Sequence, residues 1–240
     1  MSINCPGIFV TGTDTGVGKT QVAVGLVTLL ASLGRRVVGL KPVASGAVTT
    51  PAGLRNDDAL ALAAASPLAL PYEQVNPFCF APPIAPHLAA AEAGVALDVD
   101  SLCNWYQAAS AGAELAIVEG AGGWRVPLHP RGFLSDLPER LGLGVILVVG
   151  LRLGCLNHAR LTFEAIERGG RCRFLGWVGN AVDPDFERAA DNVRSLRDLL
   201  GSPPLALLPR LASPTGSAVA ACLDGPDLRR AVESAGLAPA

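Results

Sequence analysis

A glycine-rich segment near the start of the chain has the composition of a phosphate-binding loop. The sequence GTDTGVGKT occupies residues 12–20, after a short apolar run and before an apolar stretch of helical character. Glycines let backbone N–H groups approach phosphate oxygens, and the N-terminus of the next helix adds positive potential. We therefore expect Lys19 to contact the β- and γ-phosphates of a nucleotide and the Thr20 hydroxyl to ligate Mg²⁺. Five residues separate Gly12 from Gly18, one more than in the standard pattern, and a glycine-rich turn without a ligand is the alternative.

Lysine is rare in this chain. Lys19 and Lys41 are the only lysines among 19 basic residues, and the others are arginine. Lysine is a compact point charge whose donors rotate and whose pKa shifts readily, so these two positions are candidates for chemistry. Lys41 opens the segment KPVASG after the apolar run 37–40, and Ser45 in that segment offers a hydroxyl. A second cation beside the γ-phosphate would stabilise transferring charge, whereas an ordinary lysine at a strand end is the alternative.

Carboxylates occupy two further positions that could ligate a metal. Glu119 follows the apolar run 115–118 and precedes the glycine-rich residues 120–123, whose backbone could close on a phosphate. Asp57 and Asp58 open a predicted helix after Arg55-Asn56. Helix capping is the alternative for both aspartates, and we favour it for Asp57.

Two other strand ends carry polar side chains. Cys155 and His158 lie three residues apart in LGCLNH, but no acid is evidently placed to orient the histidine, so substrate contact or interface packing is favoured over a thiol nucleophile. Asn180 follows the apolar run 174–178. A carboxamide can both donate to and accept from adenine, which makes Asn180 a candidate for base recognition, with a simple turn asparagine as the alternative.

Short apolar runs alternate with helical patterns along the chain. Strands are expected at residues 8–10, 37–40, 115–118, 145–149, 174–178 and 205–208, and helices at 20–33, 57–65, 102–111, 158–168, 186–200 and 226–235. This alternation predicts an α/β fold in which a mostly parallel sheet has helices on both faces, as in P-loop NTPases, within a single domain spanning 1–240. Ligands bind beyond the carboxyl ends of such strands, so the candidate residues are expected at one edge. The proline-rich segment 67–86 is expected to be an irregular insertion.

Composition narrows the class of protein. The chain has 240 residues, of which 50% are hydrophobic and 17% charged, which excludes intrinsic disorder. No uncharged apolar run reaches the roughly 18 residues of a membrane helix, and a net charge of −2 does not favour a nucleic-acid partner. The six cysteines form no CxxC pair, and no secretory signal is visible, so a cytoplasmic location is expected.

Seven blocks of the sequence together resemble dethiobiotin synthetase. They are GTDTGVGKT, KPVASG, GLRNDDALAL, VNPF, VEGAGGW, VILVVGLRLGCLNHA and GWVGN, in this order from about residue 8 to about residue 211. The longer spacing in the phosphate loop is a feature of that family. The resemblance implies that 7,8-diaminononanoate, CO₂ and ATP are converted into dethiobiotin, ADP and phosphate. It also implies a homodimer with substrate sites near the subunit interface.

The resemblance further implies roles for single residues. Catalytic roles fall on Thr15, Lys19, Lys41 and Ser45, and Mg²⁺ ligation on Thr20, Asp58 and Glu119. The diamine-carbamate site takes Thr15, Lys41, Ser45, Gly122 and Asn157, the last of these across the dimer. The nucleotide positions are Gly16, Val17, Gly18, Lys19, Thr20, Gln21, Asp58, Glu119, Gly120, Ala121, Gly122, Asn180, Ala181, Pro209, Arg210 and Leu211. Two positions depart from the family: Gly16 is often acidic in relatives, and Arg210 replaces a tryptophan common in the loop over the base.

Two other classes of ATP-dependent protein are possible. A related synthetase that takes nitrogen from glutamine needs an additional amidase domain, for which this chain has no plausible segment. A regulatory or partitioning ATPase usually carries another lysine early in the phosphate loop, and residues 13–17 contain none.

Overall fold

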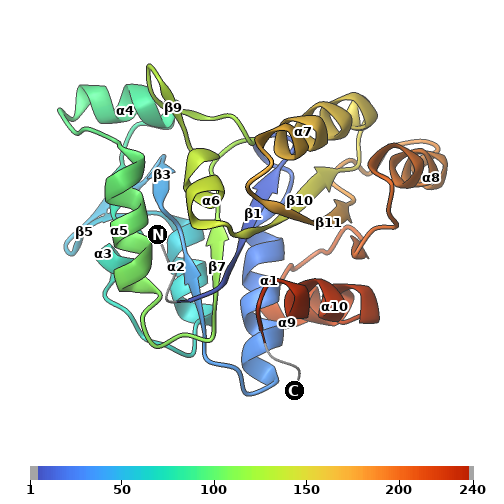
Figure 1. The fold of residues 1–240 in the computed structure, drawn as a ribbon, viewed down its shortest axis with the longest axis horizontal. Coiled ribbons are helices and arrows are strands. Elements are labelled where there is room, and N and C mark those ends of the chain that lie inside the picture. Colours follow the sequence, from blue (N-terminus) through green and yellow to red (C-terminus); the bar gives the residue numbers. More distant parts are fainter. Residues whose placement is uncertain (1–4, 238–240) are drawn as a thin grey trace.

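The computed structural model describes residues 5–237, and a parallel sheet forms their centre (Figure 1). Within these residues the main sheet has six strands in the order β12-β11-β10-β1-β7-β2, and every neighbouring pair is parallel. The strands are β1 (Gly7–Gly12), β2 (Val37–Leu40), β7 (Leu115–Glu119), β10 (Gly144–Gly150), β11 (Arg173–Asn180) and β12 (Ala206–Leu208). Every residue of β1, β2, β7 and β10 is buried, which explains their continuous apolar sequence.

Helices cover both faces of this sheet, which confirms the predicted fold class. Side chains alternate across each strand, so Ile8 and Val10 face one layer and Phe9 the other. The first layer contains α1 (Lys19–Ser32), α2 (Asp57–Ala65), α9 (Gly216–Leu223) and α10 (Pro226–Ser234); Figure 1 shows α9 and α10 beside α1. The second layer contains α5 (Val99–Ala109), α6 (Asp136–Leu141), α7 (Cys155–Gly169) and α8 (Ala189–Leu200).

The expected elements agree with the structure to within a few residues. Strand 37–40 and helix 57–65 have the expected bounds, and the other strand ends differ by at most two residues. No helix in the described part of the chain combines the length and apolar character that crossing a membrane requires.

The prediction that residues 67–86 are irregular was wrong in its central part. This segment contains the short helix α3 (Tyr72–Val75) and the strand β6 (Phe78–Phe80). β6 pairs in parallel with β3 (Val43–Ser45), which directly follows Lys41-Pro42. Because this pairing joins residues far apart in the sequence, the local proline content did not reveal it.

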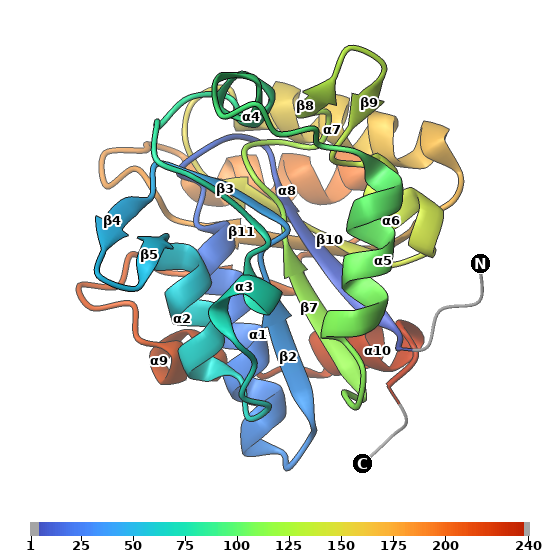
Figure 2. The ribbon, with the colours of Figure 1, turned by 90° about the vertical axis from the view of Figure 1, so that its left-hand side faces the viewer.

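Several short elements complete the edge at the carboxyl ends of the strands. They are the hairpin of β4 (Val48–Thr50) and β5 (Gly53–Arg55), the helix α4 (Pro86–Glu92), and the hairpin of β8 (Pro127–His129) and β9 (Gly132–Phe133). Figure 2 shows α4 and the β8–β9 hairpin together at the top of the molecule. The helix α9 was not predicted. Its apolar residues pack so closely on α1 that a Cβ added to Gly25 of α1 would lie only 2.5 Å from Val219.

Candidate active site

The phosphate loop joins the buried strand β1 to the buried helix α1. Gly18 is the N-cap of α1 with φ of 92°, and Gly16 has φ of 74°, a backbone conformation that favours glycine. The backbone N–H of Thr13 donates to the carbonyl of Val148 at 3.0 Å, which anchors the loop to β10. The glycines and the helix start predicted from the sequence therefore form the loop geometry that binds phosphate.

Asn180 lies against this loop. Its side chain is buried at the end of β11, and Nδ2 donates to the carbonyl of Val17 at 2.9 Å. The approach is so close that a Cβ on Gly18 would lie 2.2 Å from this nitrogen. Asn180 thus supports the loop, a contact that its sequence position did not indicate, and its contact with adenine stays a prediction.

The side chain of Lys19 is buried against the phosphate loop. Its Nζ donates to the carbonyl of Asp14 at 2.9 Å. Desolvation and the nearby charge of Lys41 lower the pKa of Lys19 to about 8, although Glu119, Asp58 and Asp14 oppose the shift. An ammonium held this way would gain from the arrival of phosphate oxygens, which replace lost hydration with negative charge.

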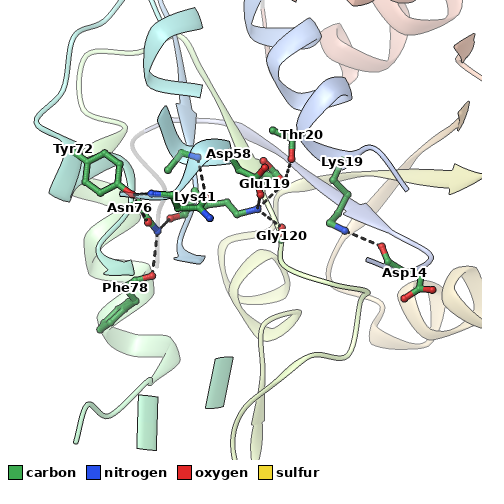
Figure 3. A network of polar contacts seen from close by, with 12 residues as sticks. Asp14, Lys19, Thr20, Lys41, Asp58, Tyr72, Asn76, Phe78, Glu119 and Gly120 are labelled. Carbon is green, nitrogen blue, oxygen red and sulfur yellow. Dashed lines mark hydrogen bonds and ion pairs between the residues drawn. The ribbon is translucent and has the colours of Figure 1, made fainter. Parts of the chain in front are cut away.

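Lys41, Asp58 and Glu119 meet in one charged cluster (Figure 3). Lys41 Nζ lies 2.7 Å from Glu119 Oε1 and 3.0 Å from Asp58 Oδ2, and it also donates to the carbonyl of Gly120 at 3.2 Å. The three side chains come from the end of β2, the start of α2 and the end of β7. The parallel sheet therefore brings together residues that the sequence separates widely.

Burial controls the charges of this cluster. Desolvation raises the pKa of Glu119, whose side chain is 1% exposed, in spite of the Lys41 charge. Desolvation alone would lower the pKa of Lys41, but its ion pairs with Glu119 and Asp58 outweigh it and the net shift is upward. Desolvation also works against ionised Asp58, yet Lys41 lowers the pKa of this carboxyl below its usual value. The ion pairs thus keep Lys41 and Asp58 in their charged forms, whereas burial and the nearby Asp58 charge work against the ionised form of Glu119.

The same cluster has the donor set for a magnesium ion bound to a nucleotide. Glu119 Oε2 is buried without a hydrogen-bond partner, while Oε1 accepts from the Thr20 hydroxyl at 2.8 Å. Within residues 5–237 no group of three or more histidine, cysteine or carboxylate side chains is placed to hold a metal. Two carboxylates and a hydroxyl nevertheless fit Mg²⁺, which commonly takes its remaining ligands from water and phosphate.

Asp57 does not cap α2, contrary to our expectation. Asn56 is the N-cap, and its Oδ1 accepts from the backbone N–H of Ala59 at 3.2 Å. Asp57 and Asp58 occupy the first turn, where the helix dipole favours negative charge. Asp58 points back toward Lys41 and is thereby left for the charged cluster.

A cavity of about 860 Å³ opens beside the loop and the charged cluster. Its walls include many of the predicted site residues: Thr15, Gly16, Gly18, Lys19, Thr20, Gln21, Lys41, Ser45, Asp58, Glu119, Ala121 and Gly122. Sequence reasoning missed Ile84, Arg125 and Val126, which line the same cavity. Arg125 and Val126 directly follow the VEGAGGW block, and that adjacency was the available signal.

The remaining predicted residues lie outside the cavity wall. Pro209, Arg210 and Leu211 follow β12, and Arg210 Nη1 lies 3.4 Å from the carbonyl of Val182. Other predicted residues that do not line the cavity are Val17, Gly120, Asn180 and Ala181. Asn157 is exposed on α7, between Leu153 and Leu161, which are 90% and 58% exposed.

Cys155 is unsuited to act as a nucleophile. Its side chain is buried at the start of α7, and burial raises the pKa of its thiol. A reactive cysteine needs a lowered pKa and access to its substrate. The structure therefore agrees with the sequence-based preference against a thiol mechanism.

Comparisons with solved structures identify the fold. The MinC:MinD cell division protein complex of Aquifex aeolicus gives a TM-score of 0.57 at 15% identity, over 96% of this chain and 94% of that one. A ParA family ATPase from Chlorobium tepidum gives 0.54 at 15% identity, over 96% of this chain and 97% of that one. At this identity the likeness shows the P-loop fold alone.

Sequence comparisons are more specific. A family model described as an AAA domain (AAA_26) matches residues 6–217. The ATP-dependent dethiobiotin synthetase BioD of Pseudomonas aeruginosa (strain UCBPP-PA14) is 53% identical, over 91% of this chain and 96% of that protein. The protein of the same name from Cellvibrio japonicus is 47% identical, over 90% of this chain and 94% of that protein. Identity of this extent, spread over nearly the whole length, shows that the chain belongs to the ATP-dependent dethiobiotin synthetase family of AAA-domain proteins.

Proposed function

We propose that this protein carboxylates 7,8-diaminononanoate with CO₂ and closes the ring to dethiobiotin, using one ATP and releasing ADP and phosphate. The observation that carries the proposal is the convergence of Lys19, Lys41, Asp58 and Glu119 on one cavity beside the phosphate loop. Family membership supplies the identity of the substrates.

ATP is proposed to bind with its phosphates on residues 16–21 and its base near Asn180, Ala181 and residues 209–211. Thr20, Asp58 and Glu119 would hold Mg²⁺, with the free Glu119 Oε2 as the oxygen best prepared for it. The ion would neutralise phosphate charge and orient the γ-phosphoryl group. Lys19 would add a second positive charge from the loop itself.

Carbamate formation is the first chemical step in this proposal. A neutral substrate amine attacks the carbon of CO₂, a C–N bond forms, and the nitrogen loses a proton to water. Asp58 and Glu119 face the cavity as well and offset the charges of Lys19 and Lys41, so the bound Mg²⁺ would make the site net positive, disfavour a substrate ammonium and favour the carbamate anion. Thr15, Ser45 and the backbone of Gly122 line the same space and are proposed to bind the diamine-carbamate.

Phosphoryl transfer and ring closure follow. A carbamate oxygen attacks the γ-phosphorus, the bond to the β-phosphate oxygen breaks, and ADP leaves. The second amine then attacks the carbamate carbon, the C–O bond to the phosphoryl group breaks, and phosphate and a proton are released. Lys41 is proposed to stabilise the negative charge of both the carbamate and the γ-phosphate, since hydrogen bonds to Glu119 and to the Gly120 carbonyl hold its ammonium at the end of β7. No covalent bond to the protein is needed.

We further propose a cytoplasmic homodimer without a nucleic-acid or membrane partner. The family resemblance suggests the dimer, and the exposed side chains of Leu153 and Leu161 on either side of Asn157 are consistent with a surface that another subunit covers. Asn157 would then reach the diamine of the neighbouring subunit.

The test is the fixation of labelled bicarbonate into an acid-stable product with ATP, Mg²⁺ and 7,8-diaminononanoate, each omitted in turn. We expect label to be fixed only in the complete mixture, with an equal amount of phosphate released. Phosphate release without fixed label would instead indicate an ATPase with another acceptor, and would refute the proposal.

A further inference from the structure

The VNPF block, residues 75–78, has no role in the mechanism above. Its Asn76 is 2% exposed, and neither Asn76 nor Tyr72 lines the cavity, so neither side chain is placed to touch a substrate. Both nevertheless lie beside the charged cluster in Figure 3. Their hydrogen bonds show how they connect to it.

Asn76 holds the backbone of Lys41. Its Nδ2 donates to the carbonyl of Lys41 at 2.7 Å and to the carbonyl of Phe78 at 3.2 Å. The backbone N–H of Lys41 donates to the carbonyl of Val75 at 2.8 Å. The peptide groups on both sides of the Lys41 Cα are thus fixed by adjacent residues of one block.

Tyr72 connects Asn76 to the start of α2. The Tyr72 hydroxyl donates to Asn76 Oδ1 at 3.1 Å and accepts from the backbone N–H of Asn56 at 2.7 Å. Asn56 is the N-cap of the helix that carries Asp58 in its first turn. Burial and the neighbouring Cys79 raise the pKa of Tyr72, so the hydroxyl keeps the proton that this arrangement requires.

These contacts close a ring. It runs from the Lys41 carbonyl through Asn76, Tyr72 and Asn56 into α2, and returns from Asp58 to the Lys41 ammonium at 3.0 Å. We propose that Asn76 and Tyr72 are positioning residues that hold Lys41 and Asp58 in their mutual geometry. The catalytic part of this inference rests on the proposed function.

The chemistry of the ring requires these residue types. Asparagine supplies a donor toward two carbonyls and an acceptor toward the phenol from a single side chain. Asn76→Asp keeps the size but places a carboxylate against the carbonyls of Lys41 and Phe78. Tyr72→Phe keeps the aromatic ring under the Arg55 guanidinium, 4.1 Å away, and removes only the hydroxyl.

The chain offers a matched control in the same segment. Trp105 Nε1 donates to the carbonyl of Gln74 at 2.7 Å, so Trp105→Phe removes a hydrogen bond to α3 that is not part of the ring. Amide hydrogen exchange of the ligand-free protein measures the ring without any reaction. We expect exchange at Asn56 and Lys41 to accelerate at least tenfold in Asn76→Asp, at Asn56 in Tyr72→Phe, and at neither position in Trp105→Phe. Unchanged exchange at both positions in the two ring variants would overturn the proposal.

Kinetics then test the consequence. We expect kcat to fall about 30-fold in Asn76→Asp and about fivefold in Tyr72→Phe, with the KM for ATP within twofold and Trp105→Phe unchanged. In a Lys41→Gln background, Tyr72→Phe should lower kcat by clearly less than fivefold, because the ammonium through which part of its effect acts is already missing. A full fivefold effect in that background, or an unchanged kcat despite faster exchange, would refute a positioning role. A wild type that fixes no bicarbonate would refute the proposed function instead, and the exchange result would still decide whether the ring links Lys41 to α2.

Discussion

Replacement of Lys41 by glutamine separates its electrostatic role from its catalytic role. In the structure its ammonium lies 2.7 Å from a Glu119 oxygen, in a pair whose side chains are 5% and 1% exposed. Removing one partner of a buried ion pair typically costs about 3–5 kcal/mol. Glutamine still offers a donor and Glu119 can take up a proton, so we expect the free energy of unfolding to fall by about 2–3 kcal/mol.

This loss should depend on pH with a definite sign. Without the ammonium, the already raised pKa of Glu119 rises further above its ordinary value of 4.5. A carboxyl whose pKa is raised on folding favours the folded state below its ordinary pKa, and this stability is lost as pH rises through the raised value. The deficit of Lys41→Gln relative to wild type should therefore be larger at about pH 8 than at about pH 5. Denaturant unfolding at the two pH values measures it.

Catalysis should respond differently from stability. We expect Lys41→Gln to lower kcat at least 100-fold, which corresponds to about 2.7 kcal/mol of barrier, while ATP affinity changes much less. The double variant Lys41→Gln/Glu119→Gln removes the stranded carboxylate, so it should recover much of the stability and none of the activity. A wild-type-like kcat in Lys41→Gln, or an equal stability deficit at both pH values, would refute this account of Lys41.

Two further predictions concern the phosphate loop. The pKa of Lys19 is about 8 and phosphates bind its ammonium form, so the Kd for ATP should rise by up to tenfold per pH unit above about pH 8. Calorimetry should show this rise in wild type and not in Lys19→Arg. A wild-type Kd that does not change with pH would contradict the prediction. Gly18→Ala should weaken ATP binding at least tenfold, because the added Cβ would lie 2.2 Å from Asn180 Nδ2. The control is Gly34→Ala, at a glycine that also has a positive φ but has no atom within 4 Å of the added Cβ. Equal ATP affinities in the two variants would show that the contact with Asn180 does not matter for binding.

The parts of the fold that could be predicted share a physical cause. A parallel strand covered on both faces must be apolar throughout, so residues 115–118 and 145–149 were visible as continuous apolar runs. The helix α9 was missed because its apolar residues reflect close packing on α1 rather than a strong amphipathic pattern. β6 was missed because its partner strand β3 lies more than thirty residues earlier in the chain.

The candidate site was likewise predictable only in part. The phosphate-loop motif was enough to single out Lys19, and residue type with strand-end position singled out Lys41 and Glu119; the structure brings all three to one cavity. The direct pairing of Lys41 with both carboxylates was not predicted, because it depends on how the ends of β2 and β7 and the start of α2 lie relative to one another. Asn76 was noted only as part of the VNPF block, and its role was not predicted. Its partners are backbone carbonyls, whose positions no sequence pattern encodes.

The origin of one phosphate oxygen tests the central claim most directly. The protein would be mixed with ATP, Mg²⁺, 7,8-diaminononanoate and ¹⁸O-labelled bicarbonate, and the phosphate analysed by mass spectrometry within the first turnovers. Phosphoryl transfer to a carbamate followed by ring closure places one bicarbonate-derived oxygen in each released phosphate. Phosphate without the label, formed alongside dethiobiotin, would contradict the carbamic–phosphoric anhydride and with it the role assigned to the charged cluster.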